Sequence, residues 1–149
     1  MSEPGESRAT VPPRLSVVTL GARDLPTLRR FYRDLGWAEV PGSDDTWCAF
    51  RLGGVVLALF PEADLAAEAS TTAERGGFTL ALNVDGRHDV DAGCDAMVAA
   101  GAMVVAAAQD RSWGGRSAYV ADPEGNRWEI AWNPGVVFGP SGEVRSFGG

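Results

Sequence analysis

The strongest constraint on the fold is an internal repeat, because one order of elements occurs twice. Each copy has the pattern of a strand, a helix and three more strands, and the copies cover residues 14–61 and 78–133. Glycines mark equivalent places: Gly36 and Gly101 follow the two helices, and Gly54 and Gly125 precede the last strand of each copy. One such unit is too small to bury its own sheet face, so two units must share a core or pair across a dimer. The sequence predicts an α+β protein of two tandem βαβββ modules.

The first copy begins with an alternating stretch at residues 15–20, which is typical of a strand. Asp24 is suited to cap the N-terminus of a helix. Apolar residues then recur at helical spacing, at Leu25, Leu28, Phe31, Tyr32 and Leu35. Three shorter strands are predicted at 37–40, 47–52 and 55–60, because turn-forming residues separate them.

The second copy repeats this order. A strand is predicted at 78–84 and a helix at 88–100. Three further strands are predicted at 103–108, 117–121 and 127–132. The segment Asp122-Pro-Glu-Gly-Asn126 is a strong turn between the last two strands, with proline second and a glycine that can take a positive φ.

Three segments lie outside the repeat. Residues 1–13 have the composition of a flexible arm, and residues 62–77 are typical of a linker loop that can include a helical turn. The tail, 134–149, is expected to lie along the body, lie across a partner or stay loose. No apolar run approaches the roughly 18–20 residues that span a bilayer, and the first residues do not resemble a secretory signal. We therefore expect a cytoplasmic protein without a membrane partner.

Composition excludes several kinds of chemistry. The net charge is −7, from 13 basic and 20 acidic residues, which argues against nucleic acid as a partner. All the basic residues are arginines, so no lysine can form a Schiff base. His88 is the one histidine, it is expected on the exposed start of the second helix, and a site of two or three histidines cannot be built in one chain. Cys48 and Cys94 lack CxxC spacing, and no disulfide is expected.

Two stretches carry a family resemblance. The first is Val17-Val-Thr-Leu-Gly-Ala-Arg-Asp24 followed by Arg30-Phe-Tyr-Arg-Asp-Leu-Gly36, and the second is Tyr119-Val-Ala-Asp-Pro-Glu-Gly-Asn-Arg-Trp-Glu-Ile130. They resemble the vicinal oxygen chelate superfamily of glyoxalases, extradiol dioxygenases, fosfomycin-modifying enzymes and bleomycin-binding resistance proteins. The resemblance spans residues 15–133. It implies a curved mixed sheet with an open cleft (the glyoxalase/bleomycin resistance/dioxygenase fold) and a homodimer.

The resemblance also implies a metal site made by one side chain from the first and last strand of each module. The matching positions are Val17, Ala58, Thr79 and Glu129, with Phe78 as the alternative to Thr79. Only Glu129 can bind a cation strongly, since valine and alanine have no lone pair and a threonine hydroxyl is a poor ligand. We therefore expect no metal and no other cofactor, and a divalent metal is the alternative.

Strand alternation predicts which side chains line the cleft. If Glu129 points into it, so do Arg127 and Ala131, whereas Trp128, Ile130 and Trp132 face a helix. The predicted ligand-binding residues are Val17, Thr19, Ala58, Phe60, Thr79, Asn83, Trp113 and Glu129. Trp113 either caps the cleft and stacks on a planar ligand, or packs on a neighbouring subunit or the sheet edge.

The cleft is thus expected to be apolar with one acid, which suits an aromatic or cationic small molecule. The first hypothesis is a metal-independent binding protein of the drug-sequestering resistance type. One alternative is a metal-dependent glyoxalase, lyase or dioxygenase-type enzyme. Another is a metal-free isomerase or lyase in which Glu129 is the catalytic base, since an apolar cleft raises the pKa of a carboxyl group. Glu129 could also be purely structural and pair with an arginine such as Arg127.

Overall fold

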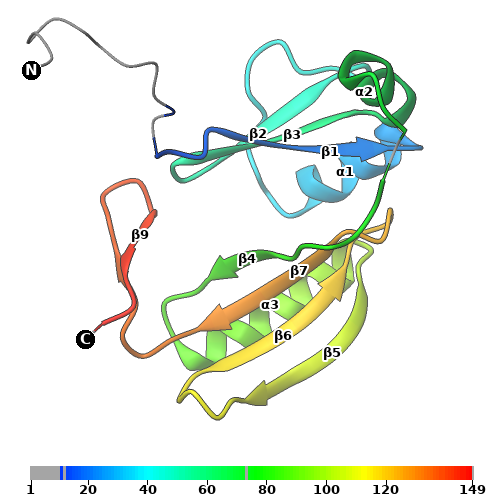
Figure 1. Cartoon of the computed structure of the whole chain (residues 1–149). Helices are drawn as coiled ribbons and strands as arrows, with labels where there is room; N and C mark the ends of the chain where they lie inside the picture. Colours follow the sequence, from blue (N-terminus) through cyan, green and yellow to red (C-terminus); the bar gives the residue numbers. More distant parts are fainter. Residues whose placement is uncertain (1–10, 12, 73, 149) are drawn as a thin grey trace, which may run out of the picture.

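The structure is a computed structural model that describes residues 11, 13–72 and 74–148 (Figure 1). In chain order its elements are β1 (Val17–Ala22), α1 (Leu25–Asp34), β2 (Cys48–Leu52), β3 (Val55–Pro61), α2 (Glu62–Ala69), β4 (Leu80–Asn83), α3 (Arg87–Ala100), β5 (Met103–Asp110), β6 (Arg116–Ala121), β7 (Arg127–Trp132), β8 (Val137–Phe138) and β9 (Val144–Ser146). Within the described residues, no helix is long and apolar enough to cross a membrane. The predicted arm, 1–13, lies almost entirely outside the described residues and stays a prediction.

Two mixed sheets confirm the predicted α+β class. The first has the strand order β1-β3-β2 and the second β4-β7-β6-β5. In each, the first strand of the module pairs in parallel with the last, and the remaining pairs are antiparallel. The two modules therefore share one topology, except that, among the described residues, the first sheet has no strand equivalent to β5. Figure 1 shows them as separate layers joined on one side by the chain between α2 and β4.

Local sequence explains why α1 forms where it does. The Asp24 carboxylate accepts a hydrogen bond from the backbone N–H of Thr27 at 3.2 Å, which caps the N-terminus. The apolar stripe is buried at Leu25, Leu28, Phe31 and Tyr32. Gly36 follows the helix with a φ of +85°, a conformation that glycine adopts without strain.

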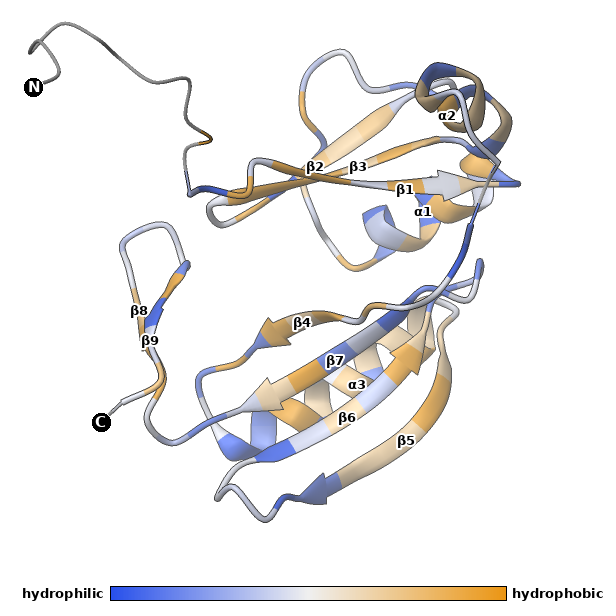
Figure 2. Ribbon diagram, viewed as in Figure 1, coloured by the Kyte–Doolittle hydropathy of each residue, from blue (hydrophilic) through white to orange (hydrophobic). Residues whose placement is uncertain are grey.

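The second module buries one side of β7 beneath α3. Trp128 and Ile130 are 2% and 1% exposed, and a Cβ built on Gly93 of α3 would lie 3.2 Å from Ile130. Because side chains alternate along a strand, Glu129 lies on the face turned away from α3. Figure 2 shows the corresponding alternation of hydrophilic and hydrophobic residues at the start of β7.

The predicted strand at 37–40 is wrong. Only an isolated bridge between Glu39 and Phe50 forms there. The Trp37 ring stacks on Tyr32, with ring centroids 5.4 Å apart, and Glu39 binds the Arg29 guanidinium at 2.8 Å. These side-chain contacts hold residues 37–40 against α1, so the backbone of this segment pairs with β2 at one residue only.

The linker prediction also needs correction, because residues 62–69 form the two-turn helix α2. None of its residues is fully buried, so it has no apolar stripe for a periodicity argument to detect. Its composition is nonetheless favourable, with Glu62 and Asp64 in the first turn and several alanines. The helix ends at Ser70, which has a left-handed φ of +56°.

The tail lies along the body rather than being loose. Strands β8 and β9 pair as a short hairpin. A Cβ built on Gly53 would lie 3.1 Å from the carbonyl oxygen of Ser141, so the hairpin tip reaches the turn between β2 and β3. The chain therefore returns from the second module to the first (Figure 1).

A buried chain of hydrogen bonds joins the two modules. The Tyr32 hydroxyl of α1 donates to the Asp122 carboxylate at 2.5 Å, and the indole N–H of Trp128 donates to the Tyr32 oxygen at 2.9 Å. All three residues are at most 4% exposed. Burial, and then the negative charge of Asp122, raise the pKa of Tyr32 well above its usual value, so the hydroxyl stays protonated and able to donate.

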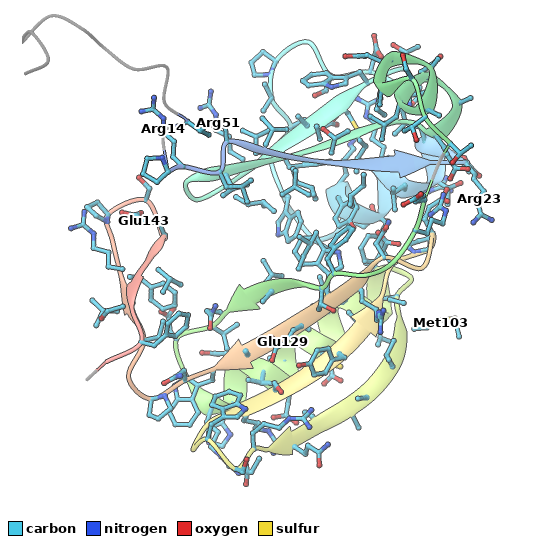
Figure 3. All side chains as sticks on the ribbon, in the orientation of Figure 1. Arg14, Arg23, Arg51, Met103, Glu129 and Glu143 are labelled. Atoms are coloured by element: carbon cyan, nitrogen blue, oxygen red, sulfur yellow. The ribbon has the colours of Figure 1, made fainter. Side chains whose placement is uncertain are left out.

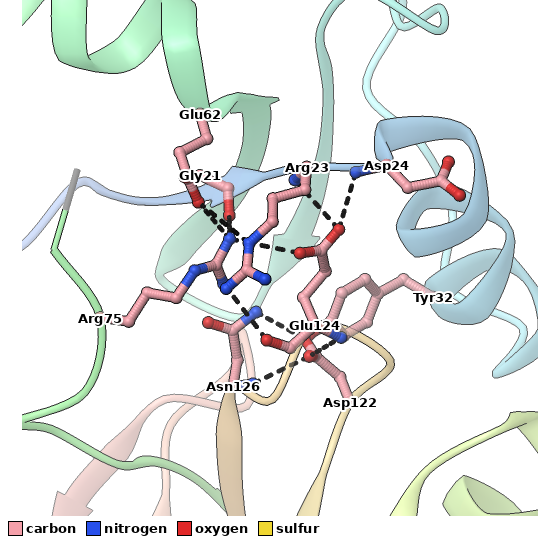
Figure 4. Close-up of polar contacts among 9 residues, drawn as sticks. All are labelled: Gly21, Arg23, Asp24, Tyr32, Glu62, Arg75, Asp122, Glu124 and Asn126. Atoms are coloured by element: carbon pink, nitrogen blue, oxygen red, sulfur yellow. Dashed lines mark hydrogen bonds and ion pairs between the residues drawn. The ribbon is translucent and has the colours of Figure 1, made fainter.

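The same aspartate organises the turn between β6 and β7. Its Oδ1 atom accepts hydrogen bonds from the backbone N–H groups of Glu124 and Asn126, each at 2.9 Å. The turn then places Glu124 at the start of α1, where its Oε2 atom accepts from the backbone N–H groups of Arg23 and Asp24 at 3.0 and 2.8 Å (Figure 4). A carboxylate there neutralises the positive end of the helix dipole.

Replacing Tyr32→Phe should lower the free energy of unfolding by about 1–3 kcal/mol, because it leaves the Trp128 N–H buried without an acceptor and removes one of the two hydrogen bonds that the Asp122 Oδ2 atom accepts. Urea denaturation measures the change. Tyr119→Phe is the matched control, since it removes a hydroxyl from a half-buried position on a sheet face. A Tyr32→Phe protein within about 0.5 kcal/mol of the parent would show that this contact does not hold the modules together.

Candidate functional site

The predicted site residues fall on both modules. On β1, Val17 is 50% exposed and Thr19 is exposed, and Thr19 is the register partner of the buried Ala58 on β3. Phe60, farther along β3, is half-buried. In the second module Thr79 is exposed just before β4, while Asn83 and Glu129 are half-buried. The register thus brings Thr19 beside Ala58, and it sets Glu129 on a different sheet.

Trp113 lies on the turn between β5 and β6 and is 49% exposed. Its ring lies over Gly115, where an added Cβ would come within 1.9 Å of the indole, so only glycine allows this position. Trp113 does not line the pocket described below. The ring therefore rests on the end of the sheet here, and its contact with a ligand stays a prediction.

Glu129 has neighbours that the sequence interpretation missed. Tyr119 on β6 is its direct register partner, so both side chains lie on the face turned away from α3. Burial, and then the Glu129 charge, raise the pKa of Tyr119. The Arg111 guanidinium carbon lies 5.7 Å from the centre of the Tyr119 ring, and its Nε donates to the Ser117 hydroxyl at 2.7 Å. Alternation along β6 could have identified Tyr119, since it shares a face with Glu129.

These three side chains give the sheet face a defined chemistry. Tyr119 offers a hydroxyl that stays protonated at neutral pH, and Glu129 offers a hydrogen-bond acceptor (Figure 3). Arg111 fixes the tyrosine ring through its cation–π contact. The group can bind a hydrogen-bonding or cationic ligand, and Glu129 can accept a proton.

A pocket of about 400 Å³ lies where β1 ends, between α2 and residues 71–72 and 74–76. Its apolar lining comes from Leu20, Leu65, Ala66, Ala69 and Phe78, and its polar lining includes Thr19, Glu62, Thr71, Thr72, Glu74, Arg75 and Asn126. A second pocket of about 220 Å³ shares Arg75 and Phe78 and is also lined by Arg127. Arg127 precedes Glu129 by two residues on the same face of β7, about 7 Å along the strand. Glu129 itself lines neither pocket.

Arg75 is the central polar residue of this pocket (Figure 4). Its guanidinium contacts the Glu62 carboxylate of α2 and donates to the Gly21 carbonyl of β1 at 3.5 Å. It also donates to both the carboxylate and the carbonyl oxygen of Glu124, each at 3.2 Å. One arginine therefore connects both modules and α2. The linker sequence gives no sign of this role, because Arg75 stands next to Glu74 in a segment without a motif.

The residues at the four family positions do not form a set of metal ligands. Val17, Ala58 and Thr79 provide no strong donor, which leaves Glu129 alone. Across the described parts of the chain, no three His, Cys, Asp or Glu side chains come together in a way that could hold a metal ion. His88 is exposed at the start of α3, away from this face.

Comparison with known proteins gives consistent matches. The model of the Glyoxalase/Bleomycin resistance protein/Dioxygenase superfamily matches residues 14–130. A structure described as a glyoxalase-related enzyme from Fulvimarina pelagi is 34% identical, covers 92% of this chain and 99% of that chain, and has a TM-score of 0.86. An uncharacterized protein of Mycobacterium bovis is 33% identical over 96 residues, which make up 62% of this chain and 62% of that protein, less than two thirds of its length.

A more distant structure shows the shared fold alone. It is described as a glyoxalase/bleomycin resistance protein/dioxygenase family enzyme from Burkholderia phytofirmans PsJN, and it is 24% identical. It covers 78% of this chain and 96% of that chain, with a TM-score of 0.67.

Glu129→Gln should move the titration of Tyr119 to lower pH, because it removes a negative charge that disfavours the tyrosinate. The chain has two tyrosines, so NMR of the ring Cζ carbons resolves both signals, and Tyr32→Phe assigns them. Glu74→Gln, on the exposed linker, removes the same charge elsewhere and should leave the titration unchanged. An unmoved midpoint in Glu129→Gln would show that the two side chains are not electrostatically coupled.

Proposed function

The chain belongs to the Glyoxalase/Bleomycin resistance protein/Dioxygenase superfamily, and we propose that it is a metal-independent small-molecule-binding protein of the drug-sequestering resistance type. Members of this superfamily bind small molecules. This chain would bind its small molecule without a metal ion. The pocket beside α2 has apolar walls with a few polar groups, which is the usual composition of a small-molecule site. The sheet face of β6 and β7 presents Tyr119 and Glu129 side by side.

One observation carries the proposal, namely the side chains at the positions where relatives bind a metal. Glu129 is the single strong donor among the four, and no other described acid, cysteine or histidine joins it to make three. A divalent ion held by one carboxylate would keep nearly all its water and would neither orient nor polarise a ligand. Binding would then depend on shape and hydrogen bonds, with Tyr119 and Glu129 contacting a polar or cationic group of the ligand.

We also propose that the protein acts as a homodimer. Strand β5 lies at the edge of its sheet and exposes three consecutive apolar residues: Met103 at 73%, Val104 at 50% and Val105 at 53%. Figure 2 shows the first part of β5 as hydrophobic, and Figure 3 shows Met103 at the start of that edge strand. Apolar residues on an open edge favour pairing with another chain. Light scattering should give twice the chain mass.

A second candidate is a metal-free isomerase or lyase with Glu129 as base. Two observations favour it: Glu129 lies beside a protonated tyrosine that could donate to a substrate oxygen, and the Fulvimarina pelagi protein is described as an enzyme. Product analysis separates the two functions, since a sequestering protein returns its ligand unchanged. Metal titration distinguishes the metal-dependent alternative from both of these functions.

After dialysis against a chelator, titration with Ni²⁺, Mn²⁺, Fe²⁺ or Zn²⁺ should show no stoichiometric binding and no rise in melting temperature. Calorimetry measures the binding in the unmodified protein and in Glu129→Gln, which lacks the single strong donor among the four family positions. One tightly bound ion per unmodified chain would overturn metal independence.

Glu129→Gln should lower the affinity for an aromatic cation by about fivefold, which is the loss expected for a half-buried ion pair. The probe is 2-naphthylmethylammonium. Binding of methyl 2-naphthoate, which has the same ring and no charge, should not change. The melting temperature should stay near that of the parent. If the parent and Glu129→Gln bind the cation with equal affinity, Glu129 does not contact the ligand. If the melting temperature of Glu129→Gln falls strongly, Glu129 has a structural role.

A further inference from the structure

We propose that the pocket between β1, α2 and residues 71–72 and 74–76 is a ligand subsite for the planar aromatic part of a molecule that carries an oxygen acceptor, a carboxylate or carbonyl, bound by Arg75. The inference rests on the proposed function in one respect, that the protein binds a small molecule. It adds a chemical class of ligand and an anchoring residue. Of the predicted ligand-binding residues, only Thr19 lines this pocket.

The walls of the pocket fit a flat apolar group. Leu65 and Ala66 of α2 form one side, and Phe78 presents a ring that is 52% exposed. A ring system placed there would remove this apolar surface from water. A volume of about 400 Å³ lies at the small end of the range for organic ligands, so one fused ring pair fits better than a large drug.

Arg75 lines the pocket and retains hydrogen-bonding capacity. Its Nη2 atom donates to the Gly21 carbonyl and to the carboxylates of Glu62 and Glu124, and its Nη1 atom donates to the Glu124 carbonyl. Within the described part of the chain, its Nε–H has no hydrogen-bond acceptor, and the side chain is 28% exposed. A guanidinium held in place by several partners costs little entropy when it binds a ligand oxygen.

The charges around Arg75 favour an acceptor over a cation. The Glu124 carboxylate is 8% exposed and already accepts from Arg23, Asp24 and Arg75. Glu62 contacts Arg75 and lies 3.7 Å from the Arg23 guanidinium. Both carboxylates are thus already engaged by Arg75, whereas Arg23 and Glu74 are exposed, where water and salt screen their charges. The acid available to a cation is instead Glu129 on β7, which lines neither pocket.

The test is a titration of ¹⁵N-labelled protein with three probes that share one ring: 2-naphthoate, methyl 2-naphthoate and 2-naphthylmethylammonium. The two acceptor probes should shift the amide signals of Gly21, Leu65, Ala66 and Gly76. The ammonium probe should bind this pocket at least about fivefold more weakly than naphthoate, because it has no acceptor for Arg75. Its shifts should appear near Glu129.

Two pairs of variants locate the site. Ala66→Trp fills the pocket and should lower naphthoate affinity at least tenfold, whereas Ala67→Trp, one residue along on an exposed position, should not. Arg75→Gln should lower naphthoate affinity about tenfold. Arg51→Gln is the matched control, because it removes the same charge far from this pocket, and it should have no effect. Arg51 lies at one end of the first module and Arg23, near the pocket, at the other (Figure 3). The Ala66 pair still decides the matter if Arg75→Gln loosens the contact between modules.

The outcomes separate this inference from the proposed function. Shifts that cluster at Tyr119, Glu129 and Ala131 with all three probes, or naphthoate affinity unchanged in Ala66→Trp, overturn the subsite and leave small-molecule binding standing. No shift with any probe also overturns the subsite. A stoichiometric metal in the earlier titration overturns metal independence, and the subsite stands if Ala66→Trp still abolishes naphthoate binding.

Discussion

The contact between Tyr32 and Asp122 is the interaction on which the arrangement of the two modules depends. It is buried, it crosses from α1 to the turn between β6 and β7, and Trp128 completes it from beneath α3. Asp122 also shapes that turn, the turn presents Glu124 to the start of α1, and Glu124 in turn helps to hold Arg75. A structural core contact thus determines where the central arginine of the pocket lies.

The distribution of chemistry over the two modules is uneven. The first module contributes apolar or weakly polar side chains at its family positions, such as Val17 and Ala58. The second contributes Tyr119, Glu129 and Arg111, a group with a hydroxyl, an acid and a fixed cation. The fold has therefore been kept while most metal donors are missing, which supports recognition by shape and hydrogen bonding.

Sequence patterns predicted the repeat, the α1 cap and the buried side of β7, because periodicity and capping depend on neighbouring residues. They failed at Trp37, whose ring stacks on Tyr32 of α1, and at α2, which has no apolar stripe. Alternation could have added Tyr119 to the site. No local pattern could have found Arg75, since its importance comes from partners on β1, α2 and a turn about 50 residues away.

The hairpin of β8 and β9 has a further consequence for how the pocket meets its ligand. The modules are connected by the chain after α2 on one side, and the hairpin reaches back to the turn at Gly53 on the other (Figure 1). Two tethers at separate places leave the modules little freedom to swing apart. The residues that line the pocket are thus largely ordered before a ligand binds. Because little further ordering is needed, less of the interaction energy is lost to conformational entropy on binding.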